Sequence, residues 1–130
     1  MASATPLRSA SSIAGLVKHL ALVEDSWFAP DLAGLPPADW YADVDWEADP
    51  DWEFHTAVDE PIAEVLAVYE QACRRAREIA TSRDLDDIGA DTSRREFTLR
   101  FVYVHMIEET ARHLGHLDVL RELLDGTTGE

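Results

Sequence analysis

The segment from Phe101 to Glu122, near the C-terminus, most constrains how this chain can fold. It has no proline and one glycine, Gly115, and most of its residues favour helices, so it predicts one long helix. At about 100° per residue, one arc of about 80° on that helix carries four polar side chains. These side chains are His105, Glu109, His113 and His116.

The polar arc lies on the apolar side of the predicted helix, because Val102, Met106 and Leu117 fall on it or beside it. Buried imidazoles and a buried carboxylate are costly unless each of them has a partner. A divalent cation would satisfy them together. The helix therefore predicts a metal site, provided that another segment of the chain contributes a ligand.

A second helix is predicted in the N-terminal part of the chain. Ser11 or Ser12 is a suitable cap, apolar residues then recur at helical spacing, and the helix should stop before Pro30. Residues 1–11 show little apolar periodicity, so we expect them to form a loose N-terminal arm. His19 lies at the border of the apolar face of this helix.

A third helix is predicted over residues 56–83, with Pro61 in its first turn. Its apolar stripe consists of Ile62, Val65, Leu66, Tyr69, Ala72, Cys73, Ala76, Ile79 and Ala80. A polar connector over residues 84–96 leads to the last helix, and no segment indicates a strand. We therefore expect an all-α bundle of three long helices, in a single domain that spans residues 1–130.

The connection across residues 29–55 is long and holds four prolines together with Trp40, Trp46 and Trp52 at a spacing of six. That spacing matches neither one face of a helix nor one face of a strand. Loops of this length are usually functional or disordered, and the aromatic residues favour order. We expect a long crossover loop that its tryptophans anchor to the body of the protein.

The chain carries 26 acidic and 11 basic residues, for a formal net charge of −15. That charge repels phosphate backbones and no basic stripe offsets it, so we expect no nucleic-acid partner. No run of eighteen apolar residues and no secretory signal pattern is present, so we expect no membrane partner. The single cysteine, Cys73, excludes an internal disulfide and fits a reducing cytoplasm. Frequent Ala, Asp and Arg beside one Lys suggest a high-GC bacterial source.

Glu109 and His113 are four residues apart, which puts a carboxylate and an imidazole on one helix face as two vertices of a metal site. The same spacing also occurs as a simple surface pair. His19 is the candidate third ligand; alternatively, it is a boundary histidine bonded to a carbonyl group or to an acid such as Glu24. Two imidazoles and one carboxylate suit Zn²⁺ first, with Ni²⁺, Mn²⁺ and Fe²⁺ as alternatives.

Several readings stay open for the neighbouring residues. His105 and His116 lie about one turn to either side of the candidate pair, and each is a further ligand, a group that orients a ligand, or an acid/base that moves a proton. His55 should be solvated in the loop, and Arg112 should form an ion pair at the boundary. Cys73 lies on the apolar stripe, where a free thiol is usually inert packing rather than a nucleophile.

Three segments of the chain resemble a known superfamily: LVKHLALVEDSWF, DPDWEF and TLRFVYVHMIEETARHLGHLDVLRE. The resemblance is to the DinB-like four-helix bundles, and more narrowly to their actinobacterial branch related to mycothiol-dependent maleylpyruvate isomerase. It covers residues 12–126, and the HMIEETARHLGH block is its most specific part.

Members of this superfamily bind a divalent metal through one histidine on an early helix and two groups four residues apart on a late helix. The resemblance therefore implies His19 as the early ligand and Glu109 with His113 as the late pair. Characterised relatives are thiol-dependent transferases or isomerases, which implies a small-molecule thiol such as mycothiol and a small electrophile as partners. His116 or His105 would then move a proton in catalysis.

One difference from the superfamily concerns the N-terminus, because relatives have a further helix before the segment that matches LVKHL. We expect the first bundle helix to be missing or to be supplied by a partner chain, as in a homodimer. An unfilled gap would expose apolar surface. The alternative to an enzyme is therefore a non-catalytic metal-binding or dimerising bundle. A third reading is a structural bundle whose histidines are polar groups of the core.

Overall fold

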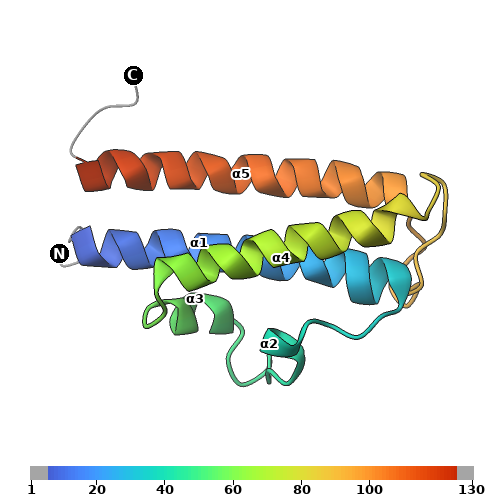
Figure 1. Cartoon of the computed structure of the whole chain (residues 1–130), viewed down its shortest axis with the longest axis horizontal. Helices are drawn as coiled ribbons and strands as arrows, with labels where there is room; N and C mark the ends of the chain where they lie inside the picture. Colours follow the sequence, from blue (N-terminus) through green and yellow to red (C-terminus); the bar gives the residue numbers. More distant parts are fainter. Residues whose placement is uncertain (1–5, 126–130) are drawn as a thin grey trace.

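The chain folds into three long helices joined by segments that contain shorter ones (Figure 1). The computed structural model describes residues 6–125, and the side chains of residues 13–123. Within residues 6–125 there is no strand, only one isolated bridge between Ile88 and Thr98, so the all-α prediction is confirmed. The helical elements are α1 (Pro6–Ser26), the π-helical η2 (Trp27–Ala33), α2 (Asp39–Ala42), α3 (Trp52–Ala57), α4 (Ile62–Thr81) and α5 (Leu99–Asp125).

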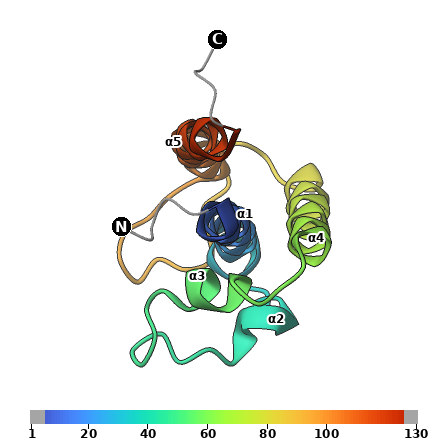
Figure 2. The same ribbon diagram turned by 90° about the vertical axis from the view of Figure 1, so that its left-hand side faces the viewer.

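Helix α1 is the central element of the fold. Figure 2 shows it with α5 above, α4 to the right, and α2 and α3 below. Helices α1 and α4 run in the same direction and α5 runs in the opposite one (Figure 1). Every residue from Ile13 to Ser26 is at least partly buried, as expected of a helix with neighbours on several sides. The main core cluster joins η2, α4 and α5 at one end; its buried members are Phe28, Leu32, Ala76, Ala80, Leu99, Val102 and Met106.

The ends of α1 differ from the predicted ones. The helix begins at Pro6, so residues 6–11 are helical rather than a loose arm, and residues 1–5 lie outside the described part. Proline is well suited to the first helical turn, where its missing N–H has no intrahelical partner to lose. Helical turns also continue past Pro30 as η2, because π-type turns accommodate a residue that has no backbone N–H to donate. They end at Gly34, whose φ of 69° is a left-handed conformation that glycine adopts without strain.

The crossover connection is partly helical, which the sequence pattern did not predict. It contains α2 and α3, and α4 begins only at Ile62, after Pro61. Two of the three tryptophans anchor the connection to α1 as expected. The ammonium group of Lys18 lies 4.3 Å from the ring centroid of Trp52 and 5.9 Å from that of Trp40. Lys18 also donates to Thr56 and pairs with Glu60, both in 2.6–2.9 Å contacts, so this buried lysine ties α3 and the turn after it to α1.

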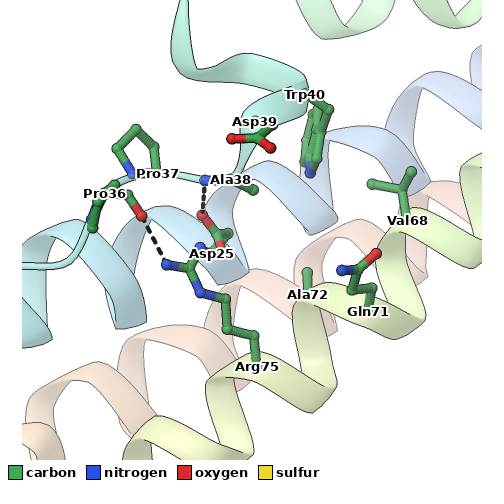
Figure 3. A pocket seen from close by; sticks show the side chains of 10 residues that line it. All are labelled: Asp25, Pro36, Pro37, Ala38, Asp39, Trp40, Val68, Gln71, Ala72 and Arg75. Carbon is green, nitrogen blue, oxygen red and sulfur yellow. Dashed lines mark hydrogen bonds and ion pairs between the residues drawn. The ribbon is translucent and has the colours of Figure 1, made fainter.

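A buried carboxylate fastens the remainder of the connection (Figure 3). Asp25 on α1 accepts hydrogen bonds from the Tyr41 hydroxyl at 2.6 Å and from the backbone N–H of Ala38 at 3.0 Å. Arg75 on α4 pairs with it at 2.9 Å and also donates to the carbonyl group of Pro36 at 2.8 Å. A cavity of about 580 Å³ lies beside this network. Because its buried charged groups are all engaged, the network serves to hold the fold.

Apolar side chains remain exposed along α4 and α5. Ile62 and Leu66 were predicted in the buried stripe of the third helix, but they are 47% and 46% exposed. On α5, Tyr103, Ile107 and Leu114 are also exposed. Both helices pack on α1, and few residues of α4 and α5 contact each other directly. The exposed apolar surface expected of an incomplete bundle is therefore present, while a partner that covers it stays a prediction.

Within the described part of the chain, no helix combines the length and the apolar character needed to cross a bilayer.

Candidate metal centre

The three predicted ligand residues come together between α1 and α5. His19 lies on α1, while Glu109 and His113 lie one turn apart on α5. One nitrogen or oxygen atom from each residue lies within 4.8 Å of the other two. The Nε2 atoms of His19 and His113 are 4.0 Å and 3.6 Å from Glu109 Oε1. Among the described residues, no other group of three such side chains converges in this way.

These separations fit a small divalent cation. Two ligands of a tetrahedral site with bonds of about 2.0–2.2 Å lie about 3.3–3.6 Å apart, so modest side-chain rotations bring all three donors to bonding distance. Glu109 and His113 are buried, whereas the side chain of His19 is 23% exposed. The His113 Nδ1 atom is buried without a hydrogen-bond partner, which a closed structural core would normally avoid. Three inward donors with one partly open side are typical of metal sites that keep a free coordination position.

Glu53 is a fourth member of the site that the sequence analysis missed. Its side chain on α3 is buried, and its Oε2 atom lies 2.7 Å from His19 Nδ1. The acid bonded to His19 is thus Glu53 rather than Glu24. A carboxylate on one ring nitrogen fixes the imidazole tautomer and aims the other nitrogen at a metal. The available signal was the position of Glu53 between two aromatic residues, Trp52 and Phe54, in a segment otherwise rich in exposed acids.

A glycine on α1 allows α3 to come this close. A Cβ atom at Gly15 would lie 2.8 Å from Cδ1 of Phe54, closer than real Cβ contacts. The Phe54 ring therefore packs where Gly15 has no side chain, and it stacks on His19 with ring centroids 5.3 Å apart. Gly15 precedes His19 by one helical turn, so the two residues share a face. The contact of Phe54 with this face positions Glu53, its neighbour in the chain.

The surroundings of His113 favour its neutral form. Burial, followed by the nearby charge of His19, lowers the pKa of His113. Neutral imidazole is the form that binds metals. The second carboxylate oxygen of Glu109, Oε2, forms a 2.7 Å ion pair with Arg112, as predicted for that arginine. This pair leaves Oε1 of Glu109 for the two imidazoles.

The two other predicted catalytic histidines lie outside the ligand group, on opposite sides of it along α5. His105 packs in an aromatic cluster, with ring centroids 4.9 Å from Trp27 and 5.8 Å from Phe101. His116 is exposed, and its ring lies 5.8 Å from that of His113. Their roles in proton transfer stay predictions.

Two further residues are placed as the sequence analysis expected. His55 is exposed and pairs with Asp49 at 2.8 Å. Cys73 is half-buried, and burial together with the nearby Glu24 raises the pKa of its thiol, with a smaller lowering by Tyr69 and Arg77. A raised thiol pKa reduces the thiolate fraction at neutral pH, which favours a packing role over a nucleophilic one.

Of three comparisons with known proteins, one finds a match. A family model described as mycothiol-S-transferase matches residues 1–126, a range that includes all three candidate ligands and Glu53. No curated protein and no solved structure matches the chain.

Proposed function

Because the chain belongs to the mycothiol-S-transferase family, we propose that it is a divalent-metal-dependent enzyme that joins a low-molecular-weight thiol of the mycothiol type to a small electrophile. An isomerase-like reaction, in which the thiol adds and later leaves, is the variant of the same chemistry. The observation that carries the proposal is the convergence of His19, Glu109 and His113 at one partly open site. A thiol of this kind and a single half-buried cysteine both suit a reducing compartment, so the proposal places the protein in the cytoplasm.

In this proposal, His19 and His113 would hold the cation through Nε2 and Glu109 through Oε1. Zn²⁺ suits this donor set best, with Ni²⁺, Mn²⁺ and Fe²⁺ as alternatives. A bound divalent cation supplies a nucleophile at neutral pH, since it lowers the pKa of a coordinated thiol. Glu53 keeps the proton of His19 on Nδ1, so that Nε2 stays free to bind.

Two histidines near the metal site would transfer the proton of the thiol. His116 is exposed beside His113, and we assign to its imidazole the acceptance of the thiol proton. The sulfur then forms a bond to the electrophilic carbon, and the leaving group departs with the electron pair of the broken bond. Where the electrophile is a double bond instead, a proton must be returned to the product, and His105 lies one turn beyond Glu109 on the other side.

A non-catalytic function is the second candidate. Ile107 and Leu114 are 69% and 55% exposed on α5, which favours a metal-binding bundle whose main property is association with another chain. Such a protein would bind the metal through the same residues and turn over no substrate.

Elemental analysis of protein purified without a His tag tests the metal. We expect about one divalent ion per chain, and its loss in His19→Ala and in His113→Ala. His55→Ala is the matched control, because this histidine is exposed and lies outside the site. If all three variants hold as much metal as the wild type, the histidines of the site are structural core groups and the proposal is wrong.

Turnover separates the two candidate functions. Mycothiol and 1-chloro-2,4-dinitrobenzene should give chloride and the thioether at a rate that depends on bound metal and falls strongly in His113→Ala. Bacillithiol and glutathione, assayed in parallel, show which thiol is used. Full metal content with no turnover for any of the three thiols would favour the non-catalytic function.

A further inference from the structure

The two carboxylate oxygens of Glu109 have different partners. Oε1 lies 3.6 Å from Nε2 of His113 and 4.0 Å from Nε2 of His19. Oε2 lies 2.7 Å from Nη1 of Arg112, which donates a hydrogen bond to it within an ion pair. One oxygen is therefore available to a cation between the two imidazoles, while an arginine holds the other.

The geometry of α5 produces this division. Arg112 follows Glu109 by three residues and His113 follows it by four, so both side chains can reach the carboxylate from the next turn of the helix. Successive residues are about 100° apart around the helix axis, so the two approach the carboxylate from different sides. The local pattern Glu-x-x-Arg-His over residues 109–113 thus provides one oxygen for a cation and withholds the other.

The contact matters more for the carboxylate than for the stability of the fold. The side chain of Arg112 is 58% exposed, and ion pairs of such exposed groups contribute little to stability. The side chain of Glu109 is only 11% exposed, and a buried carboxylate oxygen is costly unless it has a partner. Arg112 supplies that partner for Oε2.

The number of oxygens that a carboxylate offers affects which ions a site binds. Zn²⁺ takes four ligands, and a catalytic site supplies three of them and leaves one position free. Two imidazoles and a single carboxylate oxygen give that set. Mn²⁺ prefers six ligands with more oxygens among them, so a carboxylate that binds through both oxygens suits it better.

We propose that Arg112 is a positioning residue that limits Glu109 to one metal-binding oxygen. It thereby favours Zn²⁺ over Mn²⁺ and keeps one coordination position free for the thiol. The identities of the three candidate ligands do not determine this, because the same carboxylate can bind through one oxygen or through both. This inference rests on the proposed function, because it concerns how the candidate metal centre of that enzyme selects its ion.

The ratio of two dissociation constants tests the role of Arg112. Zn²⁺ and Mn²⁺ carry the same charge, so the loss of the repulsion by the arginine changes both constants by a similar factor and cancels in their ratio. In Arg112→Met we expect the constant for Mn²⁺ divided by the constant for Zn²⁺ to fall at least about tenfold, because Oε2 becomes available to the ion. Competition with a chelating dye measures both constants on the full-length chain.

Two control variants separate this role from a general effect of removing an arginine. Arg112→Lys keeps a charged donor beside Glu109 and should leave the ratio within about threefold of the wild-type value. Arg100→Met removes an arginine of α5 whose side chain is also 58% exposed and which pairs with Asp86. Because Arg100 lies outside the candidate metal centre, its loss should leave the ratio unchanged.

The visible absorption of the Co²⁺-loaded protein reports the coordination number independently of turnover. Four-coordinate Co²⁺ absorbs more strongly than five-coordinate Co²⁺, so Arg112→Met should show weaker bands than the wild type and Arg112→Lys. An unchanged ratio, or unchanged Co²⁺ bands, in Arg112→Met would overturn the assignment and leave a wild type that turns over mycothiol as proposed. A lowered ratio without turnover for any thiol would support the role of Arg112 and count against the enzyme. A wild type that binds no divalent ion would contradict both.

Discussion

At the residue scale, the most informative contact of this protein is the 2.7 Å hydrogen bond between Glu53 and His19 Nδ1. A carboxylate accepts in such a bond, so the contact favours the proton on Nδ1, and Nε2 then lies 4.0 Å from Glu109 Oε1. Arg112 has the equivalent effect on the carboxylate, since its ion pair occupies one oxygen of Glu109 and leaves the other. Two of the three candidate ligands are therefore oriented by neighbours before any metal binds.

Removing the Glu53 carboxylate should weaken metal binding. For Glu53→Ala we expect the dissociation constant for Zn²⁺ to rise about 10–100-fold, because the supporting bond to the candidate ligand His19 is lost. Glu53→Gln keeps an acceptor oxygen and should fall between the wild type and Glu53→Ala. Competition with a chelating dye measures all three constants. Glu47→Gln, an exposed acid of the same connection, is the control, and wild-type affinity in Glu53→Ala would refute the role given to Glu53.

A second acid, Glu24, should make stability depend on pH. Burial raises its pKa above the ordinary value of 4.5, and the nearby Arg77 lowers it by less. The folded chain therefore holds this proton more tightly than the unfolded chain does. The resulting stabilisation is complete below pH 4.5 and is lost as the pH rises through the folded pKa.

Glu24→Gln removes this titration. We expect the variant to match the wild type in urea unfolding below pH 4.5 and to be more stable than it at pH 7. Glu64→Gln, an exposed acid at the start of α4, should leave the pH profile unchanged. A Glu24→Gln curve that runs parallel to the wild-type curve over this whole range would contradict the expectation.

At the scale of the elements, features that depend on local sequence could be predicted, and features that depend on tertiary contacts could not. The i, i+4 spacing of Glu109 and His113 is a property of one helix, so it was readable from the sequence. The burial of Glu53 depends on α3 meeting α1 at Gly15, and the aromatic neighbours of Glu53 do not by themselves specify that contact. The same holds for Ile62 and Leu66, whose apolar character says nothing about whether a neighbouring helix is there to cover them.

The two helical glycines give a matched test of the α1–α3 contact. In Gly15→Ala the new Cβ would lie 2.8 Å from Phe54 Cδ1, so we expect a loss of about 1–3 kcal/mol in the free energy of unfolding. Gly115→Ala on α5 meets nothing within 4 Å, and it should stabilise the helix by up to about 1 kcal/mol. Urea denaturation monitored by circular dichroism measures both. Equal effects of the two substitutions would mean that α3 does not pack against Gly15.

At the scale of the whole molecule, one part of the fold is held by ion pairs of buried side chains, and another part leaves apolar side chains exposed. The α2–α3 side is fastened by buried charged groups, Lys18 with Glu60 and Asp25 with Arg75. Exposed apolar residues lie on α4 and on α5, and α5 packs on α1 away from α2 and α3 (Figure 2). A chain with a net charge of −15 repels its own copies, so any association through these residues sets apolar burial against electrostatic repulsion.

That balance predicts how homodimer formation should respond to salt. Screening the repulsion should strengthen association, so we expect a larger dimer fraction at 0.5 M than at 0.05 M sodium chloride in sedimentation velocity experiments. Ile107→Glu with Leu114→Glu should shift the protein to monomer, because burying each side chain contributes about 1.5–3 kcal/mol. Leu85→Glu, at another exposed apolar position outside α4 and α5, should have no such effect. The candidate metal ligands lie between α1 and α5, so we expect the double variant to bind as much metal as the wild type does. A wild type that stays monomeric at high salt would show that this surface does not drive self-association.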